Sequence, residues 1–463
     1  MRRPLLSAAL VIAAIPLAAC DDSRPEPRPL PPTAPTSSVA AALPVSTLPQ
    51  IVRQLAASRG IVPLAAPPRV RPALVKLGQA LAFDKILSGN RDISCMTCHL
   101  PAFATGDGRS LSVGQGATGL GPARVHPAGV FIPRNAPSLF NLSAMRHLFW
   151  DGRVAVDAAG KFITPAGPQL TPEMTRVFEF GPVSALGLFP VTNRDEMRAR
   201  GGTGNELAPI DDADFQGIWS ALMKRLLAIG EYRGLFAAAY PGTRVEDMTF
   251  AHASNAIGGF LVDQFSTRNS PWDRFLAGND AALTMPQLDG AQTFLTLKCS
   301  LCHNGATFSD DQFHNVAVAQ VGPGEGNGIG LHDDFGRMNV TGLTDDRYRF
   351  RTSPLRNVEL TGPYGHDGSI ASLREFVEHY SESDLKLLAF DPTRLEPLLR
   401  LTLVSNAPDI LQQRDTIIAG VVLTDALVDK LMAYMSALTD DAARDLSRSV
   451  PVRVPSGLPV DRP

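Results

Sequence analysis

The sequence predicts an all-α fold with two similar helical domains in tandem and long loops, preceded by a signal peptide and a proline-rich linker. The motif Cys-x-x-Cys-His occurs twice, at residues 95–99 and 299–303, and the two copies start 204 residues apart. Several apolar repeats have the period of a helix, and no alternating run predicts a large sheet. With 44% apolar and 19% charged residues in 463, the chain can bury a sizeable core, which excludes a disordered protein.

The first 19 residues are typical of a bacterial export signal. Arg2 and Arg3 precede an uncharged apolar run at 5–19, which ends Leu-Ala-Ala before Cys20. This ending resembles the lipobox and predicts that Cys20 is lipidated; the alternative is a plain secretory signal with an incidental cysteine. We therefore expect a lipid-anchored protein of the cell envelope, on the periplasmic side. Two aspartates after Cys20 favour the inner membrane.

Residues 20–69 are expected to form a proline-rich tether. Eight prolines and no glycine occur at 21–49, which favours extended polyproline II and cannot pack a core. An N-terminal domain is expected at 70–283, a C-terminal domain at 284–445 and a loose tail at 446–463.

Amphipathic patterns predict the main helices of both domains. At 72–83, Leu74, Leu77 and Leu81 share one helical face and Pro72 stands near the start. Further helical patterns cover 215–240, 249–267, 284–297 and a run capped by Thr424. Glycine recurs at every second position in 322–330, but G-x-G-x-x-G is absent, so a loop is expected there rather than a dinucleotide site.

The repeated Cys-x-x-Cys-His motif is the attachment signature of c-type haem. Two thiols add to the two vinyl groups of a haem, and the adjacent histidine is the proximal ligand of the iron. A redox dithiol would not need the histidine, and a zinc site would not need two separated copies. The motifs therefore predict two covalently bound haems c, on Cys95 and Cys98 with His99, and on Cys299 and Cys302 with His303.

The charge balance adds one exclusion. The chain has 43 basic and 46 acidic residues, a formal net charge of −3, and no basic block. Nucleic acid is therefore not an expected partner.

Over roughly residues 70–440 the chain resembles bacterial di-haem cytochrome c peroxidases and, in one detail, their MauG-type, tyrosine-ligated branch. The segments that carry the resemblance are RNAP at 134–137, FWDGR at 149–153, PLRNV at 354–358 and PYGHDG at 363–368. The resemblance implies two cytochrome c-like domains, with peroxide reacting at the N-terminal haem and electrons passing through the C-terminal haem.

The same resemblance assigns roles to single residues. Trp150 stands where the family has a tryptophan between the haems. Asn135, Thr361 and Pro363 match the ligands of an interdomain calcium ion, for which amide and carbonyl oxygens are suitable. Glu196 corresponds to the catalytic glutamate that moves a proton during peroxide cleavage, and Glu173, in the same Glu-Met dipeptide, is the alternative.

Two departures from the family's usual pattern concern the sixth ligand of each iron. Gln115 replaces the distal histidine of typical members, which would leave the N-terminal haem open; His126 is an alternative ligand from a nearby insertion. Tyr380 stands fourteen residues after His366, where electron-transferring members have methionine and MauG-type members tyrosine. A phenolate stabilises oxidised iron, whereas methionine raises the potential. Neighbouring His379 is a weaker candidate.

Together these observations predict a di-haem c-type peroxidase. It would reduce hydrogen peroxide at the N-terminal haem with electrons passed through the C-terminal haem, and store high-valent iron as MauG-type enzymes do. A conventional peroxidase, a non-catalytic di-haem electron-transfer cytochrome and a haem-binding module with a decayed site are the alternatives. Expected partners are a small electron-donor protein or a protein substrate, and the membrane through the lipid anchor; a homodimer is one possible assembly.

Overall fold

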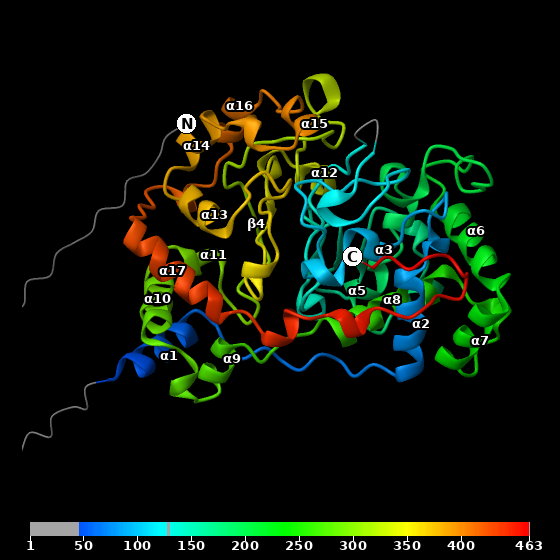
Figure 1. The fold of residues 1–463 in the computed structure, drawn as a ribbon, viewed down its shortest axis with the longest axis horizontal. Coiled ribbons are helices and arrows are strands. Elements are labelled where there is room, and N and C mark those ends of the chain that lie inside the picture. The colour runs from blue at the N-terminus through cyan, green and yellow to red at the C-terminus, as the bar shows by residue number, and fades with distance from the viewer. Residues whose placement is uncertain (1–45, 127–129, 463) are drawn as a thin grey trace, which may run out of the picture. The chain divides into compact units, whose positions relative to one another are not determined.

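A computed structural model describes residues 46–126 and 130–462, and helices predominate among them (Figure 1). The predicted signal peptide, Cys20 and residues 21–45 of the tether lie outside the described residues. Residues Ser46–Pro463 form one compact unit. We call 70–270 of this unit the N-terminal half and 271–445 the C-terminal half, because each contributes most of one hydrophobic core.

The N-terminal half is arranged around the crossing of α2 (Pro72–Phe83) and α8 (Phe250–Gln264). The predicted leucine face of α2 is fully buried in this core. Gly78 allows the close crossing, because a Cβ atom there would lie 1.9 Å from the backbone oxygen of Ala256. The remaining helices of this half are α3 (Cys95–Cys98), α4 (Pro172–Thr175), α5 (Pro182–Leu186), α6 (Phe215–Leu227) and α7 (Gly230–Ala239).

The C-terminal half repeats this arrangement with α10 (Met285–Thr296) and α17 (Asp425–Ala437). Here Gly290 permits the crossing, with a Cβ position only 2.0 Å from the backbone oxygen of Lys430. Thr424 caps α17 as predicted, accepting a hydrogen bond from Leu427. The other helices are α9 (Pro271–Leu276), α11 (Cys299–Cys302), α12 (Met338–Thr341), α13 (Leu373–His379), α14 (Ser383–Leu388), α15 (Pro397–Arg400) and α16 (Ala407–Gln412).

The strands are few and short. Strands β1 (His147–Leu148), β2 (Val154–Val156) and β3 (Phe162–Ile163) form an antiparallel sheet in that order. A second pair, β4 (Phe313–His314) and β5 (Phe350–Arg351), aligns Phe313 with Arg351. The backbone N–H of Arg351 also donates to the backbone oxygen of Trp150 at 2.8 Å, which connects the C-terminal half to the N-terminal half.

The last part of the predicted tether is not a spacer. Residues 48–58 form helix α1 (Leu48–Ser58), which packs on α10. Val52 and Ala56, one turn apart, are fully buried in the core of the C-terminal half. The helix forms where the proline run is interrupted, because residues 50–62 contain no proline while prolines precede and follow them.

The tail at 446–463 is not loose either, and this expectation was wrong. Val454 is buried in the core of the N-terminal half, and the Ser456 hydroxyl donates to Asp84 at 2.6 Å. Asp461 pairs with Lys85 at 2.6 Å and accepts a hydrogen bond from Thr97, inside the first haem motif. Figure 1 shows this red segment lying across the N-terminal half and ending near α3. The proline and arginine content of the tail suggested a loose segment, but the tail is well packed although it contains no strand.

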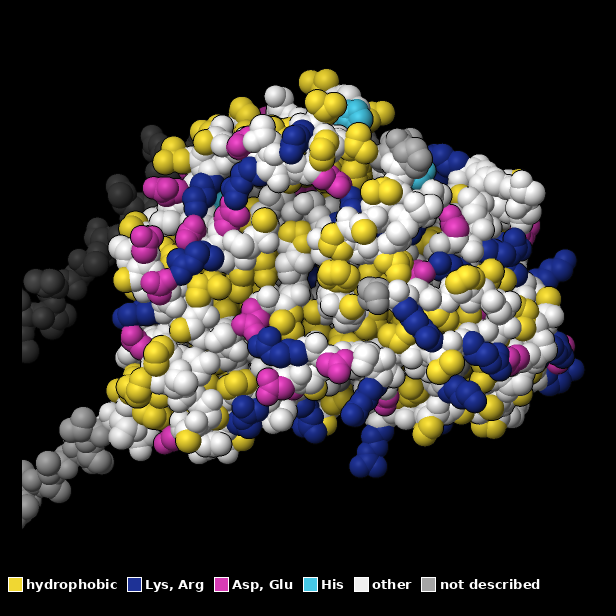
Figure 2. All heavy atoms as spheres, in the orientation of Figure 1, with side chains coloured by type: hydrophobic (Ala, Val, Ile, Leu, Met, Phe, Trp, Pro, Cys, Tyr) yellow, Lys and Arg dark blue, Asp and Glu magenta, His cyan; other side chains and the backbone are white. Residues whose placement is uncertain are grey.

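The surface is mixed in charge. Figure 2 shows basic and acidic side chains interspersed over the face that it draws. In the part of the chain that is described, no helix is both long and apolar enough to cross a membrane.

Candidate functional site: two haem cavities and their shared wall

The N-terminal cavity lies behind the first Cys-x-x-Cys-His motif. Helix α3 places Cys95 and Cys98 along its wall, and His99 follows at the C-cap. The space between the lining side chains, part of it open to solvent, amounts to about 1130 Å³. The Nδ1 atom of His99 lies 2.8 Å from the backbone oxygen of Thr105. This contact orients the ring and leaves Nε2 as the atom that can bind iron.

The second motif has the same construction. Cys299 and Cys302 on α11 line the C-terminal cavity with His303, whose Nδ1 atom lies 3.0 Å from the backbone oxygen of Phe308. Burial lowers the pKa of both His99 and His303, which favours the neutral imidazole that binds metals. The motifs, the free ring nitrogens and the two cavities therefore fit two covalently attached haems.

A buried cation gives an independent test of this fit. Arg351 lines both cavities and is buried, and its guanidinium donates only to backbone oxygens of Phe149 and Thr352. Among the described residues it forms no salt bridge, and burial lowers its pKa to about 10. Asp311 opposes this lowering of the pKa, and haem propionates are anions of a type that would pair with a buried guanidinium at this position.

The two cavities share a wall. Trp150, Asn135 and Arg351 line both of them. The indole N–H of Trp150 donates to the backbone oxygen of Asn135 at 2.9 Å, which fixes the ring in this wall. The structure therefore places Trp150 between the cavities, where the resemblance located it.

Glu196 lines the N-terminal cavity together with the first haem motif. It lies on a π-helical turn, η7 (Arg194–Arg198), and the side chain of Asn193 accepts hydrogen bonds from the backbone N–H groups of Asp195 and Glu196. Burial raises the pKa of Glu196 to about 7, Arg153 opposes this shift and Glu325 adds to it. The competing Glu173 is exposed and pairs with Arg176 at 2.7 Å, outside the cavity.

Gln115 is not among the side chains that line either cavity, and its role at the distal position stays a prediction. Its Nε2 atom donates to the backbone oxygen of Met197 at 2.7 Å. The loop lies tightly against η7, because a Cβ atom on Gly114 would be 1.8 Å from the backbone oxygen of Asp195. Gln115 therefore supports the turn that carries Glu196. His126, the alternative, is next to Gly116 and also lines neither cavity.

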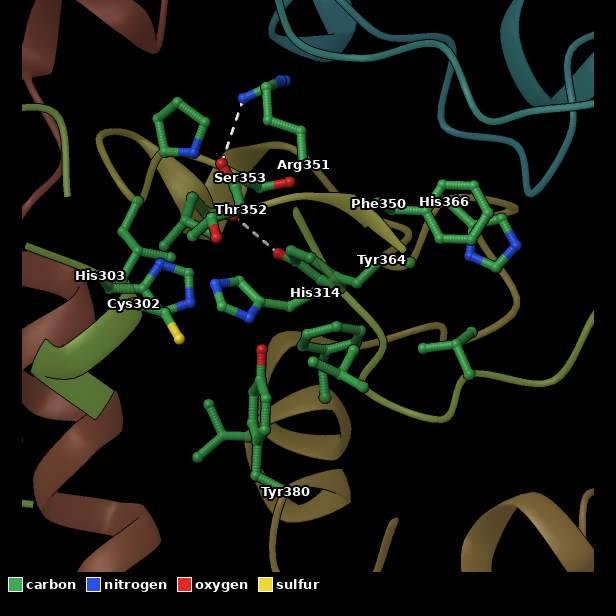
Figure 3. Close-up of a pocket in the computed structure, with 18 of the residues that line it drawn as sticks. Cys302, His303, His314, Phe350, Arg351, Thr352, Ser353, Tyr364, His366 and Tyr380 are labelled. Atoms are coloured by element: carbon green, nitrogen blue, oxygen red, sulfur yellow. Dashed lines mark hydrogen bonds between the residues drawn. The ribbon is translucent and has the colours of Figure 1, made fainter. Parts of the chain in front are cut away.

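Tyr380 lines the C-terminal cavity from the end of α13, together with Phe376 and Val377 as the helical pattern predicts. Its hydroxyl points toward Cys302, His303 and His314 (Figure 3). Burial raises the pKa of Tyr380 above its usual range. The weaker candidate, His379, faces elsewhere and its Nε2 atom lies 2.7 Å from the backbone oxygen of Val316.

The three calcium candidates lie in the wall of the C-terminal cavity: Asn135, Thr361 and Pro363. Asn135 is held there by its backbone N–H, which donates to the backbone oxygen of His366 at 2.9 Å, and by its side-chain amide, which donates to the oxygens of Arg109 and Ser110. The structure thus brings the predicted ligands into one region, and the ion itself stays a prediction.

Sequence reasoning missed His314, which lines the C-terminal cavity on β4. Its ring nitrogens lie 3.0 Å from Asp310 and 2.7 Å from Asp415. Burial disfavours the charged ring, but Asp310, the thiol of Cys302 and Asp415 outweigh burial and raise the pKa of His314 to about 10. Cys302 lies close enough to complete a group of possible metal ligands with Asp310 and His314, but its sulfur is committed to haem in the motif. Only the short spacing between Asp310 and His314 could have signalled this pair.

Known proteins of one family match the chain in sequence and in fold. The family model described as di-haem cytochrome c peroxidase matches residues 72–281. Cytochrome c551 peroxidase of Pseudomonas aeruginosa is 30% identical over 320 residues, covering 68% of this chain and 74% of the relative. The methylamine utilization protein MauG of Methylorubrum extorquens is 28% identical over 310 residues, covering 67% and 69%.

A solved structure extends the match beyond the family model. The crystal structure of a MauG-like protein associated with microbial copper homeostasis is 25% identical and has a TM-score of 0.56. The match covers 84% of this chain and 96% of that protein. The common fold therefore covers a larger share of the chain than residues 72–281.

Proposed function

Since the chain belongs to the di-haem cytochrome c peroxidase family, whose members are oxidoreductases with peroxide as acceptor, we propose that it reduces hydrogen peroxide in the N-terminal cavity. The observation that carries this proposal is Glu196, the glutamate of the N-terminal cavity wall, which shares the wall with Cys95, Cys98 and His99. When bound, the N-terminal haem would supply the iron that reacts with peroxide, and the C-terminal haem would supply the iron that receives electrons from the donor.

The reaction consumes two electrons and two protons: one hydrogen peroxide, two protons and two electrons give two water molecules. Cleavage of the O–O bond needs a group that takes the proton from one peroxide oxygen and returns it to the other, which leaves as water. Glu196 can do both, because a pKa of about 7 lets the carboxyl group accept and release a proton near neutral pH. Asn193 and Gln115 hold the backbone of its turn.

Electrons are proposed to enter through the C-terminal cavity and to reach the N-terminal cavity through the shared wall. Trp150 supports this route, because its polarisable ring lines both cavities. The donor is a small electron-donor protein or an oxidisable protein substrate. In this proposal Tyr380 and His303 are the two ligands of the C-terminal iron, which favours storage of oxidising equivalents over rapid electron transfer.

Substitution of Glu196 tests the proposal. Glu196→Gln keeps the size of the side chain but cannot move a proton, so the rate of reaction with peroxide should fall about 100-fold or more. In the parent this rate should rise as the pH is raised through about 7, because Glu196 accepts a proton only when ionised. The measurement is stopped-flow absorbance of the holoprotein mixed with peroxide over a pH series.

Glu173→Gln is the matched control, since it makes the same substitution in the same dipeptide outside the cavity. It should leave both the rate and the pH dependence unchanged. An unchanged rate in Glu196→Gln, or a large loss in Glu173→Gln, would overturn the assignment of the proton-transfer role to Glu196.

A further inference from the structure

The glycine-rich loop at 322–330 reaches from the C-terminal half to the N-terminal cavity. Glycines at every second position all have positive φ, from +67° to +98°, a conformation that other residues adopt at a cost. The loop is closed by hydrogen bonds between Glu325 and Asp333 and between Asn327 and Asp333. A Cβ atom on Gly324 would lie 2.2 Å from the backbone oxygen of His332, so this position also needs glycine for space.

The loop delivers one charged side chain, Glu325, to the cavity. Glu325 lines the N-terminal cavity with Glu196 and Arg153, although it belongs to the other half of the molecule. Its carboxylate lies 3.6 Å from Arg134 and 3.9 Å from Arg153. The side chain is 29% exposed, so it has access both to the cavity and to solvent.

Both arginines near Glu325 are shared with other carboxylates, since Arg153 also lies 3.2 Å from Asp151. Arg134 is already bound to Asp151 at 2.6 Å and to Asp334 at 2.7 and 2.8 Å. Burial raises the pKa of Glu325, Arg134 and Arg153 oppose the shift, and Asp334 and Asp151 add to it. The remaining group that faces this position is Glu196, on η7, which senses the charge of Glu325. Glu325 is therefore a carboxyl group that can change protonation within a fixed frame.

The proposed reaction needs such a group. Glu196 transfers a proton from one peroxide oxygen to the other, so O–O cleavage takes up no proton from solvent. Return of the enzyme to its resting state takes up two electrons and two protons and releases the second water. These two protons must come from solvent and reach the reacting oxygen inside the cavity.

We propose that Glu325 is the residue that passes protons from solvent into the N-terminal cavity during the reductive part of the cycle. This inference rests on the proposed function, and it gives the glycine-rich loop a role in the chemistry of the other half. Glu196 serves the cleavage of peroxide and Glu325 serves the reduction that follows.

The test separates these two phases in the holoprotein. Stopped-flow mixing with one equivalent of peroxide measures the first phase, and addition of ascorbate with a small redox mediator measures the second. Glu325→Gln should slow the second phase about 10-fold or more. The limiting rate of the first phase at high pH should stay unchanged, and its pH dependence should shift to lower pH because Glu325 no longer raises the pKa of Glu196. In Glu325→Gln the second phase should also show a larger solvent isotope effect in D₂O than in the parent. Its rate in this variant should rise with the concentration of acetate buffer, because a small acid can replace the missing carboxyl group.

Two further variants make the result decisive. Glu325→Asp keeps an acid and should recover most of the second-phase rate without a response to acetate, whereas Glu173→Gln should behave as the parent. Parent-like rates and isotope effects in Glu325→Gln would overturn the proposal, as would equal loss in the glutamine and aspartate variants, which would indicate a structural role. If instead Glu196→Gln leaves the first phase unchanged, the proposed function fails and not the role of Glu325.

Discussion

At the scale of single residues, the wall between the two cavities contains a buried arginine, Arg351, that forms no salt bridge with any described residue. The guanidinium of Arg351 donates only to backbone oxygens, although an unpaired buried cation is unfavourable. Other buried arginines of this chain, Arg134 and Arg356, pair with buried aspartates. Arg124 is also buried and donates only to backbone oxygens, but unlike Arg351 it lines neither cavity. Arg351 is therefore the one of the two that is placed to meet an anionic group of the cofactor.

Tyr380 distinguishes storage of oxidising equivalents from ordinary electron transfer. If its oxygen binds the C-terminal iron, Tyr380→Phe removes one ligand and should change the spin state of that haem alone. Tyr380→Met should raise its reduction potential, because an anionic oxygen favours oxidised iron and a thioether does not. Electron paramagnetic resonance of the ferric holoprotein and potentiometric titration measure the two effects.

Tyr364→Phe is the control for this experiment. Tyr364 lines the same cavity, but its hydroxyl donates to the backbone oxygen of Val358 at 2.8 Å. The control should leave the spectrum and the potential of the C-terminal haem unchanged. If Tyr380→Phe is equally silent, Tyr380 is a packing residue and the MauG-type assignment is wrong.

Local sequence could identify the residues that attach the haems but not those that line the cavities. Cys95, Cys98 and His99 are contiguous, so spacing alone defines their chemistry. Glu196 and Glu173 share the same dipeptide, and only the fold shows which one faces the cavity. Gln115 aligned with a distal ligand, and only the fold shows that its amide is hydrogen-bonded to the backbone of η7 at Met197.

At the scale of elements, each half uses one helix pair to position its haem motif. The motif helices α3 and α11 follow α2 and α10, the first members of the two crossings. Gly78 and Gly290 let the backbones approach closely, so the helices act as a rigid base for the cysteines. The bounds of α2 match the predicted 72–83, because Pro72 starts the helix and its leucine face is buried.

The tail could not be predicted in the same way, because its partners are distant in sequence. Asp461 lies 364 residues from Thr97, to which it is hydrogen-bonded. Nothing in the composition of 446–463 encodes this contact. The same is true of Glu325. The sequence predicts a loop at 322–330, but it does not predict that this loop reaches the N-terminal cavity.

The tail contact predicts a role in stabilising the first haem motif. Asp461→Asn removes the charge that pairs with Lys85, whose side chain is 16% exposed, and weakens the hydrogen bond from Thr97. We expect a loss of about 1.5–3 kcal/mol in the free energy of unfolding, the range for hydrogen bonds to charged groups. Denaturant titration of the holoprotein, followed by haem absorbance, measures this loss.

Asp441→Asn is the matched substitution for the tail experiment. The side chain of Asp441 is 87% exposed and lies 3.8 Å from Arg444, so its removal should change the stability very little. Equal stability of the two variants would show that the tail adds nothing to the attachment region of the first haem.

At the scale of the whole molecule, buried contacts join the two halves into one catalytic unit. Arg134 of the N-terminal half binds Asp334 of the C-terminal half, and both side chains are nearly fully buried. Arg351 donates its backbone N–H to Trp150 across the same boundary. These contacts lie in or beside the wall that both cavities share. The residues that line the cavities therefore also fix the position of the two haem motifs relative to each other.

The sequence could predict two haem sites and a family resemblance, but not that each half completes the cavity of the other. Trp150 from the first half reaches the C-terminal cavity, and Glu325 from the second half reaches the N-terminal cavity. Such exchange depends on the packing of segments far apart in the chain, which periodicity does not encode.

The last prediction concerns attachment of the whole molecule to the membrane. The lipobox-like ending at Cys20 predicts a lipidated N-terminus, and the 25 proline-rich residues at 21–45, if extended at about 3.1 Å each, would allow a separation of up to roughly 80 Å from the bilayer. Cys20→Ala should move the protein from the membrane to the soluble periplasmic fraction in a bacterium that processes lipoproteins, because the variant has no thiol at position 20 to which lipid can be attached. Peroxide reduction by the released protein should equal that of the parent, since α1 and both cavities begin beyond the anchor. Fractionation and mass spectrometry of the mature N-terminus measure this outcome, and an unmodified N-terminus with unchanged fractionation would establish a plain secretory signal instead.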